Sequence, residues 1–249
     1  MTLTVSFDDL SIGWPNRTLM ENVSGKFDLE AWNYTLPIIG RTGRGKSTLL
    51  YALSGMSLPL SGSVAWRLPE QIGWTAQSMS SGSFNDVRRQ KFGFLLQDAT
   101  MIPCFTVAEN LRHILRLRGI TTDAESRIGL SIERMLIRGE TVGDFRDKFP
   151  TQLSGGMRQR MALAASIAHD PQVLFADEPT ASLDDETGME VLGVVRRWLD
   201  ERAGTRAFVF VTHRVETLRE GARATQMLQL DTVAVGDGQR VVHHPRPIA

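Results

Sequence analysis

The octapeptide GRTGRGKS, Gly40 to Ser47, constrains the fold of this chain more than any other stretch. It matches G-x-x-x-x-G-K-[ST] at every fixed position. The β-type run Tyr34 to Gly40 leads into it, and leucines then recur at helical spacing. Strand, glycine loop and helix in this order confirm the motif, so the sequence predicts a parallel α/β sheet built around the loop. Pro37 is awkward in such a strand, because it removes a hydrogen-bond donor.

The loop predicts binding of a nucleoside triphosphate. Glycines let backbone N–H groups turn inward around the β- and γ-phosphates, and the helix dipole points its positive end at the anion. Lys46 adds a cation, and the Ser47 hydroxyl ligates Mg²⁺. The alternative is a glycine turn ahead of an ordinary core helix. The predicted phosphate-binding residues are Gly40, Arg41, Thr42, Gly43, Arg44, Gly45, Lys46, Ser47 and Thr48.

A pair of acids follows a second apolar run, in VLFADEP from Val173 to Pro179. The run is typical of a buried parallel strand, and ligands of such sheets gather at the carboxyl ends of strands. A nucleoside triphosphatase needs an acid for its metal and a group that positions water. We therefore predict that Asp177 holds Mg²⁺ through water and that Glu178 polarises the attacking water. Standing alone, the pair would indicate only an acidic turn.

A second glycine motif, LSGGMRQR from Leu153 to Arg160, lies far along the chain from the first. Apolar residues recur at helical spacing after it, and the helix that they predict ends before Pro171. Ser154 is placed to cap this helix, so that Gly155 and Gly156 would offer N–H groups to an anion.

The rest of the chain gives a coarse outline. Residues before the loop and shortly after it favour short strands and turns, and Val107 to Arg146 is helical. The sheet resumes with Val173 to Ala176 and Ala207 to Val211, which flank a helical segment, Thr187 to Arg202. The C-terminal GDGQRVVHHPRPIA indicates a turn, a short strand and a loose end.

With LSGGM in place, the chain resembles the nucleotide-binding subunit of an ATP-binding cassette (ABC) transporter, from about Leu3 to Gly238. The resemblance implies an α/β fold, in which a P-loop NTPase core with a mostly parallel sheet and flanking helices carries an N-terminal antiparallel β subdomain and a helical subdomain insert. It implies one domain over residues 1–249, with the core and β subdomain at approximately 1–96 and 160–249 and the helical subdomain at approximately 98–158. It rests on motifs in a fixed order: the phosphate loop, Gln97 in GFLLQD, Leu153 to Met157, the acid pair, Ser182 to Asp184 in SLD, and His213 in FVTHR.

The resemblance also implies roles for single residues toward ATP and Mg²⁺. Gln97 would contact Mg²⁺ or the water and relay the nucleotide state to a membrane partner. His213 would contact the γ-phosphate and orient the catalytic Glu178. Asp184 would lie at a subunit interface, and Trp14 would stack on adenine. Without the motif order, these residues would indicate a solvated glutamine, a structural histidine, a helix cap and a turn or core aromatic.

Two subunits of this family meet head to tail, and the LSGGM-type signature of each closes over the ATP held by the other. The resemblance therefore implies a second ATPase subunit, as a homodimer, and a lone subunit that binds ATP but barely hydrolyses it. Met157 departs from the family pattern, in which Gln is commonest. Arg41 and Arg44 add charge where small residues are commoner.

Composition bounds the partners. Lys plus Arg equals Asp plus Glu at 28 each, which gives no general attraction to nucleic acid or to an anionic membrane. Cys104 is the only cysteine, so no intrachain disulfide can form, and the N-terminus does not have the polarity of a secretory signal. We expect a cytoplasmic protein, peripheral on the inner face of the membrane, with no specific nucleic-acid partner.

The phrase RRQKFGFLLQDATMIPCFTVAENL is most similar to the lipoprotein-release, macrolide-efflux and cell-division group. That similarity implies separate integral-membrane subunits. A short helix near Asn85 to Gln90 is a candidate contact with them, although a run of charge such as Arg88, Arg89 and Lys91 more commonly indicates a solvated face. The alternatives are a soluble ABC ATPase acting on nucleic acid or ribosomes, and a regulatory member that does not transport.

Overall fold

The computed structural model describes residues 3–14, 16–76, 82–96, 101–137, 139–181, 183–214, 221–235 and 238–248. Gln97 and Ser182, two residues of the predicted motifs, lie outside the described residues.

A six-stranded sheet in the order β10-β9-β3-β8-β7-β6 forms the centre of the fold. All its neighbouring strands are parallel except β10, which folds back antiparallel on β9. Because β3, β8 and β7 are parallel neighbours, their carboxyl ends meet at one edge, where Gly40, Val211 and Asp177 lie. The strands are β3 (Thr35–Gly40), β6 (Phe92–Leu95), β7 (Val173–Asp177), β8 (Ala207–Val211), β9 (Gln226–Val235) and β10 (Gly238–Pro247).

A second, antiparallel sheet has the order β2-β1-β4-β5. Two of its strands are long, not short as predicted. β1 and β2 stay paired from Thr4 opposite Asp28 to Trp14 opposite Arg17, because bulges absorb the irregular register between these ends. The strands are β1 (Thr4–Trp14), β2 (Arg17–Asp28), β4 (Ser61–Arg67) and β5 (Gln71–Thr75).

The helices follow the predicted order. The segment predicted as helical contains three helices, the first of which begins with a capping box. Thr106 Oγ1 accepts a hydrogen bond from Glu109 N at 3.2 Å, and Glu109 accepts one from Thr106 N at 2.8 Å. The helices are α1 (Lys46–Leu53), α2 (Gly82–Lys91), α3 (Val107–Leu117), α4 (Ala124–Glu133), α5 (Gly143–Arg146), α6 (Gly155–Ile167) and α7 (Asp185–Asp200), and a 3-10 turn spans Pro150–Gln152.

Alternation along the central strands builds two apolar layers. On β7, Val173 and Phe175 pack in the cluster that contains the antiparallel sheet and α1. Leu174 and Ala176 pack in the other cluster, with α3, α4, α6 and α7. Every residue of β7 and β8 is buried, so the sheet is covered on both faces, as parallel sheets are.

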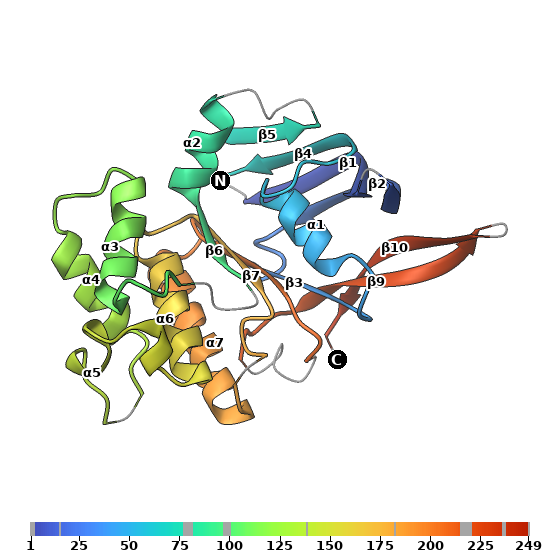
Figure 1. Ribbon diagram of the computed structural model, residues 1–249. Helices are drawn as coiled ribbons and strands as arrows, with labels where there is room; N and C mark the ends of the chain where they lie inside the picture. Colours follow the sequence, from blue (N-terminus) through green and yellow to red (C-terminus); the bar gives the residue numbers. More distant parts are fainter. Residues whose placement is uncertain are drawn as a thin grey trace.

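Figure 1 shows this arrangement: helices α3 to α7 gather on one side, the antiparallel sheet and α1 lie on the other, and the β9–β10 hairpin projects from the end of the central sheet. The predicted fold class is therefore confirmed. Among the described helices, none combines the length and the apolar character needed to cross a membrane.

Pro37 is tolerated because of its register. Phe208 N donates to Tyr34 O at 2.8 Å and Thr212 N to Ile38 O at 3.2 Å, so the even-numbered positions of β3 face β8. The backbone of Pro37 therefore faces β9, and the pairing of β3 with β9 begins only at Ile38. The donor that proline lacks falls where no ladder exists.

The C-terminal segment is a ten-residue strand, so the prediction of a short strand and a loose end is wrong. β10 pairs along its whole length with β9. Ile248 N donates to Thr225 O at 3.1 Å, which places Pro245 and Pro247 at positions whose backbone faces away from β9. Two nearby prolines argue against a paired strand in the sequence, and only this register makes the strand possible.

A buried arginine links the turn after α6, the end of α7 and the start of β8. Arg206 is 5% exposed, bonds to Asp170 and to the Trp198 carbonyl, and places its guanidinium carbon 4.8 Å from the Trp198 ring centroid. Arg206→Ala removes the buried donor of the Trp198 carbonyl and leaves Asp170 paired only with the exposed Arg202, so we expect it to lower the free energy of unfolding by about 3–5 kcal/mol in urea titrations. Arg202 is the control, because it lies 2.9 Å from the same carboxylate with its side chain 63% exposed. Arg202→Ala should cost less than about 1 kcal/mol, and equal losses for the two variants would contradict the prediction.

Candidate nucleotide site

The glycine loop leads into α1, whose N-terminus has no side-chain cap and faces open space. Gly43 and Gly45 have φ values of 79° and 81°, left-handed conformations that glycine adopts without strain. In the described part of the chain, no side chain caps α1 and its first turn has no acid. A Cβ added at Gly43 would meet nothing within 4 Å. The positive end of α1 and its N–H groups therefore face a space that can hold an anion.

A cavity of about 520 Å³ lies in front of this helix start, within the range of small-molecule sites. Trp14, which is 55% exposed, lines the same cavity as the phosphate loop. This places an aromatic face and an anion site in one hollow. The lining residues are Gly13, Trp14, Arg17, Leu19, Thr42, Gly43, Gly45, Lys46, Ser47, Thr48, Tyr51, Ser57 and Glu178.

The loop cations take different positions. Lys46 is 8% exposed and lines the cavity, and its Nζ donates to Arg41 O at 3.3 Å. Arg41 is exposed and Arg44 half-buried, and neither belongs to the lining. Gly40 ends β3 so close to β9 that a Cβ would lie 2.7 Å from Leu230 O. Of the loop's three cations, Lys46 therefore lines the cavity, together with Arg17 from β2, whereas Arg41 and Arg44 lie outside its wall.

Asp177 lies buried at the end of β7, 2% exposed. Its Oδ2 accepts a hydrogen bond from the Tyr51 hydroxyl at 3.1 Å. Its Oδ1 has no partner among the described residues. A buried carboxylate oxygen without a donor is costly unless a ligand supplies one, and Ser47 offers a hydroxyl oxygen in the adjoining cavity. These oxygens suit a hydrated Mg²⁺ ion.

Glu178 and His213 meet at the same edge of the sheet. His213 Nδ1 lies 3.1 Å from Glu178 Oε2, and Glu178 N donates to Val211 O at 3.0 Å. Glu178 has φ 52°, a left-handed conformation that strains a residue with a Cβ. Its side chain nevertheless lines the cavity. The geometry thus brings together the predicted water-polarising acid and the histidine predicted to orient it.

The second glycine motif starts α6 as predicted. Ser154 Oγ accepts from Met157 N at 3.2 Å, which is the predicted cap. Ser154 and Gly155 are exposed, and a Cβ added at Gly155 would meet nothing within 4 Å. Among its described lining residues, the cavity at the phosphate loop has none from α6. The structure therefore places the two glycine motifs apart within one chain.

Asp184 caps the next helix. Its carboxylate accepts from Thr187 N and Thr187 Oγ1, both at 2.9 Å, and these bonds lower the pKa of Asp184. The cap is exposed, so the carboxylate keeps access to solvent.

Packing and hydrogen bonds join the start of α6 to the segment that follows the acid pair, and join that segment to Arg214. A Cβ on Gly156 would lie 3.0 Å from Leu183 Cδ2, so the two segments pack closely. Gln159, 1% exposed, donates to Pro179 O at 3.0 Å. Arg214, next to His213, donates to Leu183 O at 3.3 Å and lies 3.0 Å from an Asp185 carboxylate oxygen. The start of α6 and the segment that follows the acid pair are therefore packed together, and we call them one block.

Sequence reasoning missed five residues of the cavity wall, which are Gly13, Arg17, Leu19, Tyr51 and Ser57. Arg17 and Leu19 enter because β2 pairs with β1 beside Trp14. Tyr51 had a detectable signal, since it lies four residues after Ser47 and shares its face of α1. No motif marks Ser57.

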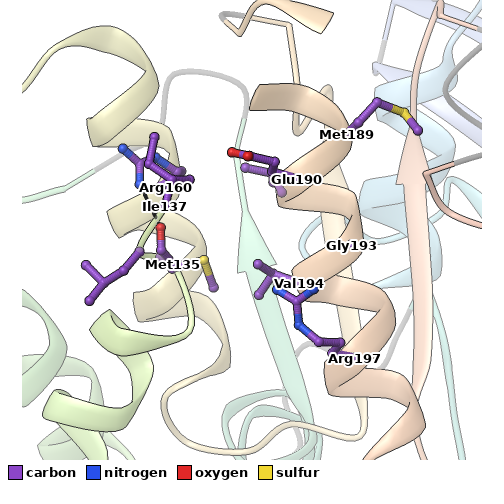
Figure 2. Close-up of a pocket in the computed structure, with 10 residues that line it drawn as sticks. Met135, Ile137, Arg160, Met189, Glu190, Gly193, Val194 and Arg197 are labelled. Carbon is purple, nitrogen blue, oxygen red and sulfur yellow. Dashed lines mark hydrogen bonds between the residues drawn. The ribbon is translucent and has the colours of Figure 1, made fainter. Parts of the chain in front are cut away.

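A second hollow of about 490 Å³ lies between α6, α7 and the segment after α4 (Figure 2). Arg160 in its wall is 3% exposed and donates to both Glu140 oxygens at 2.6 and 2.7 Å. Burial raises the pKa of Glu140, but the bonds from Arg160 and Ile137 N outweigh it, so the net pKa is lowered. The hollow shares none of its described residues with the phosphate cavity. Its lining is Met135, Leu136, Ile137, Arg160, Met189, Glu190, Val191, Gly193, Val194 and Arg197.

Known proteins are similar to this chain in sequence and in fold. Residues 25–181 match the family model of the ABC transporter. An uncharacterized ABC transporter ATP-binding protein of Thermotoga maritima is 35% identical over 184 residues, 74% of each chain. The lipoprotein-releasing system ATP-binding protein LolD of Legionella pneumophila is 34% identical over 75% of this chain and 82% of its own. The dimeric, post-hydrolysis structure of the ATP-binding cassette MJ0796 with ADP and Pi superposes with a TM-score of 0.74 at 25% identity, covering 90% of this chain and 93% of that one.

The strain at Glu178 predicts a separable effect on stability. Asparagine tolerates the left-handed conformation better than glutamine, and both substitutions remove the charge beside His213. We expect the Glu178→Asn variant to be more stable than the Glu178→Gln variant, with a free energy of unfolding about 1 kcal/mol higher in urea denaturation. Equal stabilities would show that the backbone here is not strained.

Proposed function

The chain belongs to the ABC transporter family, and from this premise we propose that it hydrolyses ATP as a head-to-tail homodimer and drives separate integral-membrane subunits. The observation that carries the proposal is the separation of two anion sites. The cavity beside Lys46 holds the phosphate loop, whereas the capped start of α6 stands exposed outside it. An exposed helix start with open space at Gly155 suits a phosphate presented by another molecule. A second copy of the chain presents one.

Within one subunit, the cavity supplies binding. Lys46 and the N–H groups of the loop would hold the β- and γ-phosphates, and Trp14 would stack on adenine. Ser47 and Asp177 would hold Mg²⁺, and Gln97 is assigned to the same ion by resemblance. Bound Mg²⁺ would neutralise charge on the phosphate oxygens.

Hydrolysis would use the contact between Glu178 and His213. Glu178 lines the cavity and would polarise the attacking water. His213, whose Nδ1 lies 3.1 Å from Glu178 Oε2, would fix the orientation of that carboxylate and reach the γ-phosphate. In the dimer, Ser154, Gly155 and Gly156 of one subunit would close over the ATP of the other, with Asp184 at the interface. Groups supplied in trans contribute about 10³ to 10⁵ in rate in other nucleotide hydrolases.

The membrane partner is proposed from the relatives. LolD is named as the ATP-binding protein of a lipoprotein-releasing system. We propose that this chain likewise works at the inner face of the membrane, in contact with integral subunits. Arg88 in α2 donates to Gly55 O at 2.9 Å and Arg89 pairs with Asp86, so both arginines already have partners within the chain. A soluble ABC ATPase acting on nucleic acid or ribosomes remains the rival, and the balanced charge of the chain argues against it.

Complementation between two inactive variants tests the shared site. Lys46→Ala disables the phosphate loop, and Gly155→Asp places a carboxylate at the donated helix start. Random pairing makes about half of the dimers mixed, and each mixed dimer has one complete site, so equal mixtures should recover about a quarter of the wild-type ATPase rate. Each variant alone should be inactive.

The two variants also serve as controls for one another. Gly155→Asp should bind ATP as the wild type does, since its own cavity is untouched and no neighbour lies within 4 Å. Lys46→Ala should lose most ATP affinity. A mixture as inactive as its components, with both variants folded, would contradict a site built from two subunits.

Affinity capture from native membranes tests whether the partner is an integral-membrane subunit. Glu178→Gln should arrest hydrolysis and hold the ATP-bound dimer, so tagged protein with ATP should retain integral-membrane subunits from detergent-solubilised native membranes. The double variant Lys46→Ala/Glu178→Gln is the control, because it should not hold ATP and should retain less. Recovery of ribosomes or DNA alone would overturn the transporter function.

A further inference from the structure

Tyr51 connects the nucleotide cavity to the buried acid at the end of β7. It lies on α1, in the turn after Lys46, and its hydroxyl donates to Asp177 Oδ2 at 3.1 Å. The two residues are 126 positions apart in the sequence, so only the fold brings them together. No step of the proposed hydrolysis uses this contact.

Tyr51 lies between the nucleotide cavity and the Asp177 carboxylate. Tyr51 lines the cavity, whereas Asp177 is 2% exposed and does not. The phenol thus stands at the boundary between the cavity and the carboxylate. Its ring packs against the apolar cluster that contains Leu49, Leu50 and Leu53, so the hydroxyl is carried by a side chain held in place.

The Asp177 carboxylate is only half satisfied by this contact. An ionised carboxylate offers about four lone-pair sites on two oxygens. Tyr51 takes one on Oδ2, and the buried Oδ1 has no partner among the described residues. A hydroxyl that fixes one oxygen therefore also fixes where the other points, and leaves it able to accept from a further donor.

We propose that Tyr51 is a positioning residue for magnesium: by holding Oδ2, it orients Asp177 so that the remaining lone pairs meet the water of the metal. This rests on the proposed function, because it concerns the ion that would accompany ATP in this cavity. Its effect falls on the linkage between metal and nucleotide. ATP binding without metal depends on the loop and is independent of Tyr51.

The test measures binding, not turnover. A non-hydrolysable fluorescent ATP analogue is titrated in EDTA and at increasing free Mg²⁺. Tyr51→Phe keeps the ring and removes the hydroxyl, so its affinity in EDTA should match the wild type within about twofold, and the gain in affinity on adding Mg²⁺ should shrink by about 3- to 10-fold. Wild-type affinity in EDTA also establishes that the variant is folded.

Matched variants test whether Tyr51 acts through the Asp177 carboxylate. Tyr34→Phe makes the same change at the only other tyrosine of the chain and should leave the Mg²⁺ gain intact. In an Asp177→Asn background, Tyr51→Phe should cause no further change, because the carboxylate through which it acts is gone.

The outcomes separate this proposal from the function on which it rests. An unchanged Mg²⁺ gain in Tyr51→Phe overturns the proposal, as does an equal loss of affinity with and without metal, which would indicate packing alone. A wild-type protein that binds no analogue in either condition would refute the proposed function itself. Analogue binding with a reduced Mg²⁺ gain supports both.

Discussion

The positive end of α1, which no described side chain caps, is the constraint on which the rest of the structure depends. The loop can aim it only because Gly43 and Gly45 accept left-handed backbone angles. The parallel order β3-β8-β7 then sets the neighbours of this helix start, since it brings the end of β7 and the segment after β8 to the same edge. Asp177, Glu178 and His213 are therefore gathered by strand order rather than by their positions in the chain.

The sequence predicted what short-range chemistry decides. The phosphate loop, the Ser154 cap and the strands around Val173 and Ala207 each carry their signal within a few residues, and the structure has them where the patterns indicate. What it could not predict depends on register. Whether a proline can sit in β3 or β10 is decided by which way its backbone faces, and pairing partners lie far away in the chain. The hydrogen bond from Tyr51 to Asp177 could not be predicted either, because its two partners are 126 positions apart in the sequence.

The two glycine motifs, each of which could bind phosphate, are not redundant. They do not serve one cavity, yet Gly156 packs on Leu183 and Gln159 donates to Pro179 O, so the start of α6 is held against the segment that follows Glu178. These contacts pack the two halves directly against each other. In a head-to-tail dimer, this block would connect the site that a subunit keeps with the site that it donates.

The outward prolines of β10 have a consequence for how copies of the chain associate. An edge strand normally offers free N–H groups that can recruit another strand, which is the usual start of sheet-to-sheet aggregation. Pro245 and Pro247 remove two such donors from this edge of the central sheet. Growth of the sheet from one molecule into the next is therefore disfavoured at these two positions.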